Sequence, residues 1–209
     1  MRKTFMISGL YAVTPDEINT DLLVAKVEAA LQGGISVLQY RNKLADHKLQ
    51  TQQARAILLL CRQYQVPLII NDSVKICLTL DADGVHIGAD DGNLTEIRSR
   101  IGEDKILGAS CYNRFDLALA AQQAGADYVA FGACFASYTK PSAPVANLSL
   151  FEQTQVQLHI PAVAIGGITL ANATQVIEAG ARSIAVINAI FNADDVKYAT
   201  QQFAQLFKD

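Results

Sequence analysis

The sequence predicts a single-domain α/β protein with the (β/α)8 fold, or TIM barrel, over residues 1–209. Short runs of strand-forming apolar residues alternate with longer segments of helical periodicity, and eight such runs follow one another. This alternation implies parallel strands joined by right-handed helical crossovers. No composition break or low-complexity linker divides the chain. An open doubly wound sheet is the alternative, but SGLYAVTPD in the first repeat is neither a GxGxxG nor a Walker motif.

The expected strands share a short apolar core bounded by polar residues or glycine. They cover residues 7–13, 35–41, 68–71, 84–87, 106–110, 128–131, 162–165 and 183–187. Each is short enough for a strand buried in a parallel sheet, and each precedes a segment long enough to return the chain as a helix.

The first helix illustrates how the intervening segments are interpreted. Thr14 is expected to cap it, with Pro15 at the first helical position and Glu17 completing a capping box. One apolar face follows at helical spacing, formed by Leu23, Val27, Ala30 and Leu31. The glycines at 33–34 end the helix, and a second helix is expected over residues 48–64.

Composition excludes several classes of protein. Apolar residues make up 51% and charged residues 18%, which excludes intrinsic disorder. The net charge of -3 supplies no basic field for nucleic acid or an anionic membrane. Four cysteines without a CxxC pair argue against a zinc site. The opening residues do not form a signal peptide, and no apolar run reaches the roughly 18 residues of a membrane span, so we expect a cytoplasmic protein.

In a barrel of this kind, chemistry is found where the strands end. The second expected strand ends in QYRNK, and alternation places Gln39, Arg41 and Lys43 on one face. Solvated charges on an exposed edge are the alternative interpretation. The regular alternation with an apolar opposite face favours a polar barrel mouth.

Acidic residues follow the next two strands. Asn71, Asp72 and Ser73 taken alone are typical helix caps. However, Asp72 and either Asp90 or Asp91 would both stand at the barrel rim, where two carboxylates and phosphate oxygens suit Mg²⁺. A lone histidine in an apolar run, such as His86, is usually a core residue.

Later strand ends point to a phosphorylated ligand. Ser137, Thr139 and Lys140 form a loop that can cradle phosphate, although an ordinary loop is about equally compatible. After the last two strands, Gly167 and the backbone at 187–188 match the common phosphate site of such barrels. Cys111, beside Ser110, is interpreted as a small buried residue.

Together these pieces resemble the thiamine phosphate synthase family over nearly the whole chain. The matching segments are YAVTP, QYRNK, ND, GVHIGADD, GAS, SYTK and IGGI, in this order. The resemblance implies a transferase that joins 4-amino-5-hydroxymethyl-2-methylpyrimidine diphosphate to 4-methyl-5-(2-phosphooxyethyl)thiazole, giving thiamine phosphate and diphosphate. It also implies a dissociative mechanism in which diphosphate leaves first and the thiazole nitrogen captures the resulting methylene cation.

The resemblance implies roles for the strand-end residues toward the first substrate. Gln39, Arg41, Lys43 and Asn71 would hold the pyrimidine diphosphate. Asp72 and Asp91 would bind Mg²⁺, which bridges the diphosphate. His86 and Ser110 would line the site beside them.

Toward the second substrate, Ser137 and Thr139 would help to place the thiazole phosphate. Gly167, Ile187 and Asn188 would complete that site through backbone N–H groups. Lys140 would contact the leaving diphosphate. The groups expected to act in catalysis are therefore Arg41, Lys43, Ser110 and Lys140.

The sequence departs from the family pattern at four positions: Ala89, Ala133, Ala136 and Asn188. None removes a charge that the mechanism needs. Two alternative enzymes are a thiazole tautomerase of the same fold and a sugar-phosphate epimerase or isomerase, and a third alternative is a non-catalytic phosphate binder. Asp91, Thr139 and Lys140 favour the synthase.

Overall fold

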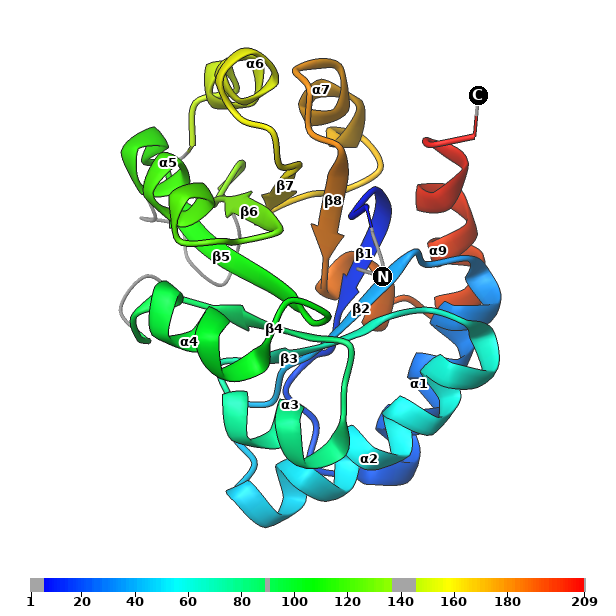
Figure 1. Cartoon of the computed structure of the whole chain (residues 1–209). Helices are drawn as coiled ribbons and strands as arrows, with labels where there is room; N and C mark the ends of the chain where they lie inside the picture. Colours follow the sequence, from blue (N-terminus) through cyan, green and yellow to red (C-terminus); the bar gives the residue numbers. More distant parts are fainter. Residues whose placement is uncertain (1–5, 89–90, 137–145, 209) are drawn as a thin grey trace. The chain divides into compact units, whose positions relative to one another are not determined.

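The structure is a computed structural model that describes residues 6–88, 91–136 and 146–208. Eight strands form a closed barrel in sequence order, and helices alternate with them along the chain (Figure 1). The strands are β1 (Gly9–Val13), β2 (Val37–Tyr40), β3 (Leu68–Asn71), β4 (Gly84–Ile87), β5 (Ile106–Tyr112), β6 (Tyr128–Phe131), β7 (Ala162–Ile165) and β8 (Ser183–Val186). The (β/α)8 prediction is therefore confirmed, and the open sheet is excluded.

The helices follow the strands in the expected places. They are α1 (Thr20–Gly33), α2 (His47–Tyr64), α3 (Val74–Leu80), α4 (Leu94–Ile101), α5 (Phe115–Gln123), α6 (Ser149–Gln157), α7 (Ala173–Glu178), α8 (Asn188–Phe191) and α9 (Val196–Gln205). Contacts divide the chain into two compact units, Gly9–Val85 with the chain from Val186 onward, and a unit built on His86–Ala185. A single domain over residues 1–209 stays a prediction.

The predicted start of the first helix is wrong. The Thr14 hydroxyl does not cap a helix, because it donates to the Arg41 carbonyl oxygen at 2.7 Å and accepts from the Arg41 amide at 2.8 Å. The chain then runs on to Asn19, whose side chain caps α1 by accepting from the Leu22 amide. The predicted end is confirmed, since Gly34 has φ +95° and caps α1 in the left-handed conformation.

The predicted apolar face of α1 is buried, as expected for Leu23, Val27, Ala30 and Leu31. Helix α9 packs beside α1, and the two lie side by side in Figure 1. Their approach is close at Gly33, where a Cβ atom would lie 2.4 Å from Cβ of Thr200. Any larger residue at position 33 would therefore separate the two helices.

Acidic side chains hold the beginnings of two strands. Asp83 accepts from the Leu68 amide at 2.9 Å, and Asp127 accepts from the Leu107 amide at 2.8 Å. Asp127 also pairs with Arg98, a buried guanidinium of α4, at 2.5 Å. These groups lie at the strand beginnings, where barrels place stability rather than chemistry.

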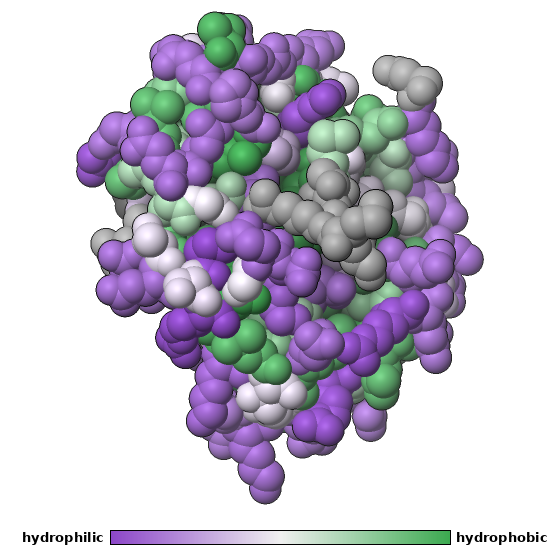
Figure 2. Space-filling model, in the orientation of Figure 1, coloured by the Kyte–Doolittle hydropathy of each residue, from purple (hydrophilic) through white to green (hydrophobic). Residues whose placement is uncertain are grey.

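Outward-facing residues are mostly polar, and the face in Figure 2 is largely hydrophilic. All four cysteines are buried thiols outside any disulfide, and burial raises the pKa of Cys61, Cys111 and Cys134 to about 12. The interpretation of Cys111 as a small buried residue is therefore confirmed. Within the three described ranges, every helix is too short or too polar to cross a membrane.

Candidate active site at the strand ends

A polar pocket of about 240 Å³ lies where β2 and β3 end. The predicted residues that line it are Arg41, Lys43, Asn71 and Asp72. Two cationic side chains and a carboxylate therefore share one pocket, although their segments are about thirty residues apart in the sequence. Parallel strands produce this juxtaposition because neighbouring carboxyl ends emerge at the same edge.

The polar side chains at the end of β2 and in the residues that follow it become steadily more exposed. Gln39 is buried, Arg41 is half-buried and Lys43 is exposed. The Gln39 amide donates to the Tyr11 hydroxyl at 2.9 Å, so it is held from the neighbouring strand β1. The strand therefore leads from a fixed interior amide to a solvent-facing ammonium group.

Arg41 has a partner that the sequence did not reveal. One terminal nitrogen of its guanidinium donates to both carboxylate oxygens of Asp16, at 3.1 Å each. Asp16 also accepts from the Lys43 backbone amide at 2.6 Å. The only sequence signal for Asp16 is its place just after β1, since several other candidate site residues also follow the ends of strands.

The third strand ends in a compact turn that serves two purposes. Asp72 has φ +58°, a left-handed conformation that aspartate adopts more readily than most residues. Its Oδ2 accepts from the Asn71 amide at 2.6 Å and lies 3.5 Å from Lys43 Nζ. Ser73 caps α3 by accepting from the Ile76 amide at 3.2 Å. Capping is thus correct for Ser73, while Asn71 and Asp72 line the pocket.

A second polar group lies in the other compact unit, on β4, β5 and β6. His86 Nε2 is 2.8 Å from the Ser110 hydroxyl, and Nδ1 is 2.9 Å from the Tyr128 hydroxyl. The rings of His86 and Tyr128 stack with centroids 5.5 Å apart. Burial lowers the pKa of His86 to about 4. The imidazole is therefore neutral at pH 7, with one nitrogen donating and the other accepting.

Gly88 and Asp91, both after β4, are joined by a backbone hydrogen bond. The Asp91 amide donates to the Gly88 carbonyl oxygen at 3.1 Å, and Asp91 is exposed. A Cβ atom at position 88 would lie only 2.2 Å from Asp91 Oδ2. Glycine at 88 therefore makes room for this carboxylate. Asp90 and Ala89 lie outside the described residues.

The end of β7 requires glycine for reasons of packing. Gly167 has φ +66°, and a Cβ atom there would lie 2.4 Å from the Phe135 carbonyl oxygen. Asn172 fixes the same turn by donating to the Gly167 carbonyl oxygen at 3.0 Å. Close packing against Phe135 is thus one reason for glycine at position 167. The expectation that Gly167 also lets an anion approach stays a prediction.

The other predicted phosphate contacts are only partly described. Asn188 is exposed and begins α8, a helix of 4 residues for which Ile187 is the N-cap residue. Ser137, Thr139 and Lys140 lie outside the described residues, and the roles predicted for them therefore stay predictions.

The donor chemistry at Asp72 and Asp91 fits magnesium, a hard cation that takes oxygen ligands. Among residues 6–88, 91–136 and 146–208, no three His, Cys, Asp or Glu side chains gather closely enough to hold a metal. Magnesium usually needs only one or two carboxylates when a substrate supplies phosphate oxygens. Each of these carboxylates, taken by itself in its own compact unit, is therefore a donor that suits a metal bound together with a diphosphate.

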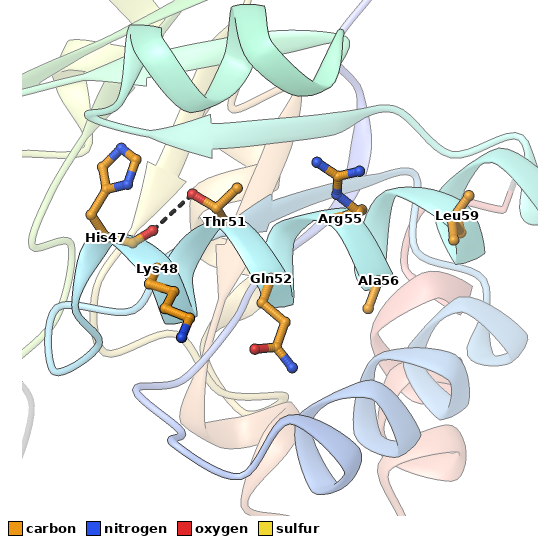
Figure 3. Close-up of a pocket in the computed structure, with 7 residues that line it drawn as sticks. All are labelled: His47, Lys48, Thr51, Gln52, Arg55, Ala56 and Leu59. Carbon is orange, nitrogen blue, oxygen red and sulfur yellow. Dashed lines mark hydrogen bonds between the residues drawn. The ribbon is translucent and has the colours of Figure 1, made fainter.

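A second, more open groove runs along α2, lined among others by Lys48, Gln52 and Arg55 (Figure 3). Lys48 and Gln52 lie on one side of the helix in this view, and Arg55 lies on the other. None of the predicted site residues lines this groove. His47, at its end, is exposed.

Comparisons with known proteins are consistent over nearly the whole chain. A family model described as thiamine monophosphate synthase matches residues 10–190. A thiamine-phosphate synthase of Methylobacillus flagellatus is 55% identical over 96% of both chains. One of Aromatoleum aromaticum is 50% identical over 96% of this chain and 97% of its own.

Solved structures give the same result. A thiamine phosphate pyrophosphorylase of Pyrococcus furiosus is 33% identical, with a TM-score of 0.85 over 95% of this chain and 94% of its own. A 3-hexulose-6-phosphate synthase is 14% identical, with a TM-score of 0.72 over 96% and 99% of the two chains. That second likeness shows the barrel fold alone.

Proposed function

Because the chain belongs to the thiamine monophosphate synthase family, we propose that it joins 4-amino-5-hydroxymethyl-2-methylpyrimidine diphosphate to 4-methyl-5-(2-phosphooxyethyl)thiazole. The chain is a transferase, and the products of the proposed reaction are thiamine phosphate and diphosphate. The observation that carries the proposal is the pocket at the ends of β2 and β3. There Arg41 and Lys43 supply positive charge beside the carboxylate of Asp72.

In the proposed reaction, the bond between the pyrimidine methylene carbon and the diphosphate oxygen breaks first, and its electron pair leaves with the diphosphate. The thiazole nitrogen then donates its lone pair to the methylene cation. A leaving group with this much negative charge needs positive charge placed in advance, which Arg41 and Lys43 provide. Asp72 and Asp91 would hold Mg²⁺, which neutralises charge on the diphosphate oxygens when bound.

The neutral state of His86 suits a site in which a carbocation forms. A protonated imidazole would repel the cation, whereas the buried neutral ring adds no charge. Its contact with Ser110 orients that hydroxyl, and the contact with Tyr128 holds the ring in place. We assign Ser110 and His86 to the wall of the site, with Gln39 and Asn71 as further polar contacts of the first substrate.

For the second substrate, backbone N–H groups at Gly167, Ile187 and Asn188 are proposed to bind the thiazole phosphate, with Ser137 and Thr139. Lys140 is proposed to contact the leaving diphosphate. Gly167 lies in a turn of left-handed glycines, and Asn188 begins a helix. The first backbone N–H groups of a helix have no intrahelical acceptor, which supports anion binding at Asn188.

The test is incubation of the purified chain with both substrates and Mg²⁺, with chromatography of thiamine phosphate and a parallel assay of diphosphate. We expect equal amounts of the two products and no reaction with EDTA. Release of diphosphate without thiamine phosphate would mean that the leaving group departs but the thiazole nitrogen does not capture the cation. A folded chain with Mg²⁺ that forms neither product would overturn the proposal and favour a tautomerase or a binder.

A further inference from the structure

One carboxylate beside the proposed diphosphate pocket has no part in the chemistry described above. Asp16 lies in the loop between β1 and α1 and meets one terminal nitrogen of the Arg41 guanidinium through both carboxylate oxygens. Its Oδ1 also accepts from the Lys43 backbone amide at 2.6 Å. That backbone contact fixes the carboxylate, and the fixed carboxylate in turn orients the guanidinium.

The loop that carries Asp16 is anchored at the next residue. The carbonyl oxygen of Glu17 accepts from the Asn42 side-chain amide at 2.6 Å and from the Gln53 side-chain amide at 2.9 Å. Gln53 is fully buried on α2, and its oxygen accepts from the Tyr40 hydroxyl at 2.8 Å and again from Asn42 at 3.0 Å. Buried amides with satisfied hydrogen bonds are rigid points of a structure. The backbone beside Asp16 is therefore held by Asn42, just after β2, and by Gln53 on α2.

The geometry leaves Arg41 able to bind an anion. The ion pair uses one terminal nitrogen, whereas a guanidinium carries five N–H donors on three nitrogens. The side chains of Arg41 and Asp16 are about equally exposed, at 30% and 32%. Because Asp16 binds one terminal nitrogen of the planar guanidinium, the N–H groups of the other nitrogens point in a fixed direction toward phosphate oxygens.

We propose that Asp16 is a positioning residue that orients the Arg41 guanidinium for the diphosphate group. This inference rests on the proposed function for the identity of the diphosphate ligand. The Lys43 backbone amide holds the Asp16 carboxylate in place, and that carboxylate in turn holds the Arg41 guanidinium. Asp16 therefore acts through Arg41. Asparagine at position 16 would keep the shape and one oxygen acceptor but lose the charge that holds the guanidinium.

The experiment measures binding of inorganic diphosphate by calorimetry, with and without Mg²⁺, and steady-state kinetics for both substrates. For Asp16→Asn we expect the Kd of diphosphate and the KM of the pyrimidine diphosphate to rise about tenfold, the scale of one charge-assisted hydrogen bond. The KM of the thiazole phosphate should change by less than about threefold, whereas kcat should fall, because a misoriented Arg41 stabilises the leaving diphosphate less well. Asp16→Glu should restore part of the diphosphate affinity.

Two controls separate positioning from other effects. Asp116→Asn removes the carboxylate of another exposed arginine pair, with Arg114 on α5, and should leave diphosphate binding unchanged. In an Arg41→Ala background, Asp16→Asn should have no further effect on the Kd. Thermal unfolding of each variant checks that it is folded. If Asp16→Asn does not fold, the diphosphate Kd is compared between Asp16→Glu and the wild type instead.

Three results would overturn the inference. They are unchanged diphosphate binding in folded Asp16→Asn, tighter binding because the carboxylate competes with the ligand, and an equal loss in the Arg41→Ala background. Calorimetry needs no turnover. A wild-type chain that binds diphosphate through Asp16 and Arg41 but forms no thiamine phosphate would refute the proposed function alone.

Discussion

The hydroxyl of Thr14 makes two hydrogen bonds with the backbone of Arg41, donating to its carbonyl oxygen at 2.7 Å and accepting from its amide at 2.8 Å. Thr14 is fully buried, and its own amide donates to the Gln39 carbonyl oxygen at 2.9 Å. The residue just after β1 therefore fixes the backbone just after β2, at Arg41, whose side chain lines the proposed diphosphate pocket.

Thr14→Val should lower the free energy of unfolding by about 2–4 kcal/mol, because it keeps the shape of the side chain and leaves two backbone groups without their partner. Thr14→Ser keeps the hydroxyl and should lose only about 1 kcal/mol, for one methyl group. Urea unfolding followed by circular dichroism measures both. A Thr14→Val variant as stable as Thr14→Ser would show that these bonds contribute little.

The stability of the chain should depend on pH through His86. Burial lowers its pKa to about 4 in the folded state, against an ordinary value of 6.5, so between these values the unfolded chain binds the extra proton. This contribution to stability is complete above pH 6.5 and is lost as pH falls to about 4, by on the order of 3 kcal/mol. Urea unfolding from pH 4.5 to 7 measures it.

His86→Gln is the matched control for that titration, because glutamine keeps polar contacts for Ser110 and Tyr128 but carries no titrating group. Its unfolding free energy should change less with pH than that of the wild type over the same range. Identical slopes in the two proteins would mean that His86 titrates at its ordinary pKa.

Arg41→Ala should raise the KM for the pyrimidine diphosphate by about 10- to 100-fold, since it removes a charge-assisted contact with the leaving group. The KM for the thiazole phosphate should change little. Arg41→Lys keeps the charge without the planar fork, so an intermediate KM is expected. Steady-state kinetics with each substrate in turn measures these KM values. Unchanged KM and kcat in Arg41→Ala would show that Arg41 does not bind the diphosphate.

Asp91→Ala should leave the fold intact and sharply reduce the rate by weakening the proposed binding of metal and diphosphate. Gly88→Ala should act in the same direction, because its Cβ atom would displace the Asp91 carboxylate. We expect the Mg²⁺ concentration for half-maximal rate to rise about tenfold, with stability changed by less than about 0.5 kcal/mol. Normal Mg²⁺ dependence in folded Asp91→Ala would exclude Asp91 as a ligand.

The fold was predictable because its signal is local. Each strand is a short apolar run, and each apolar helix face follows from residues three or four positions apart, as at Leu23 and Val27. The end of α1 was predictable for the same reason, since Gly34 adopts a conformation that glycine favours. The start of α1 was not, because the Thr14 hydroxyl bonds to Arg41, 27 positions away, rather than to its own helix.

The candidate site was predictable where charged residues stand at strand ends, as with Arg41 and Asp72. Its supporting contacts were not. Tyr128 lies in an apolar run and reads as a core residue until its hydroxyl is found beside His86. Gln53 reads as one of several polar residues of a helix, and only the fold brings its amide to the Glu17 carbonyl oxygen. Such partners depend on tertiary placement, which local periodicity does not encode.

The close packing of Gly33 on Thr200 has a consequence for folding during synthesis. At roughly 5–20 residues per second, a ribosome needs on the order of ten to thirty seconds to pass from the first residue to the second. Throughout that interval the surface of α1 around Gly33 lacks the neighbour it has in the finished barrel. Completion of the α1–α9 contact is therefore a late event of biosynthesis.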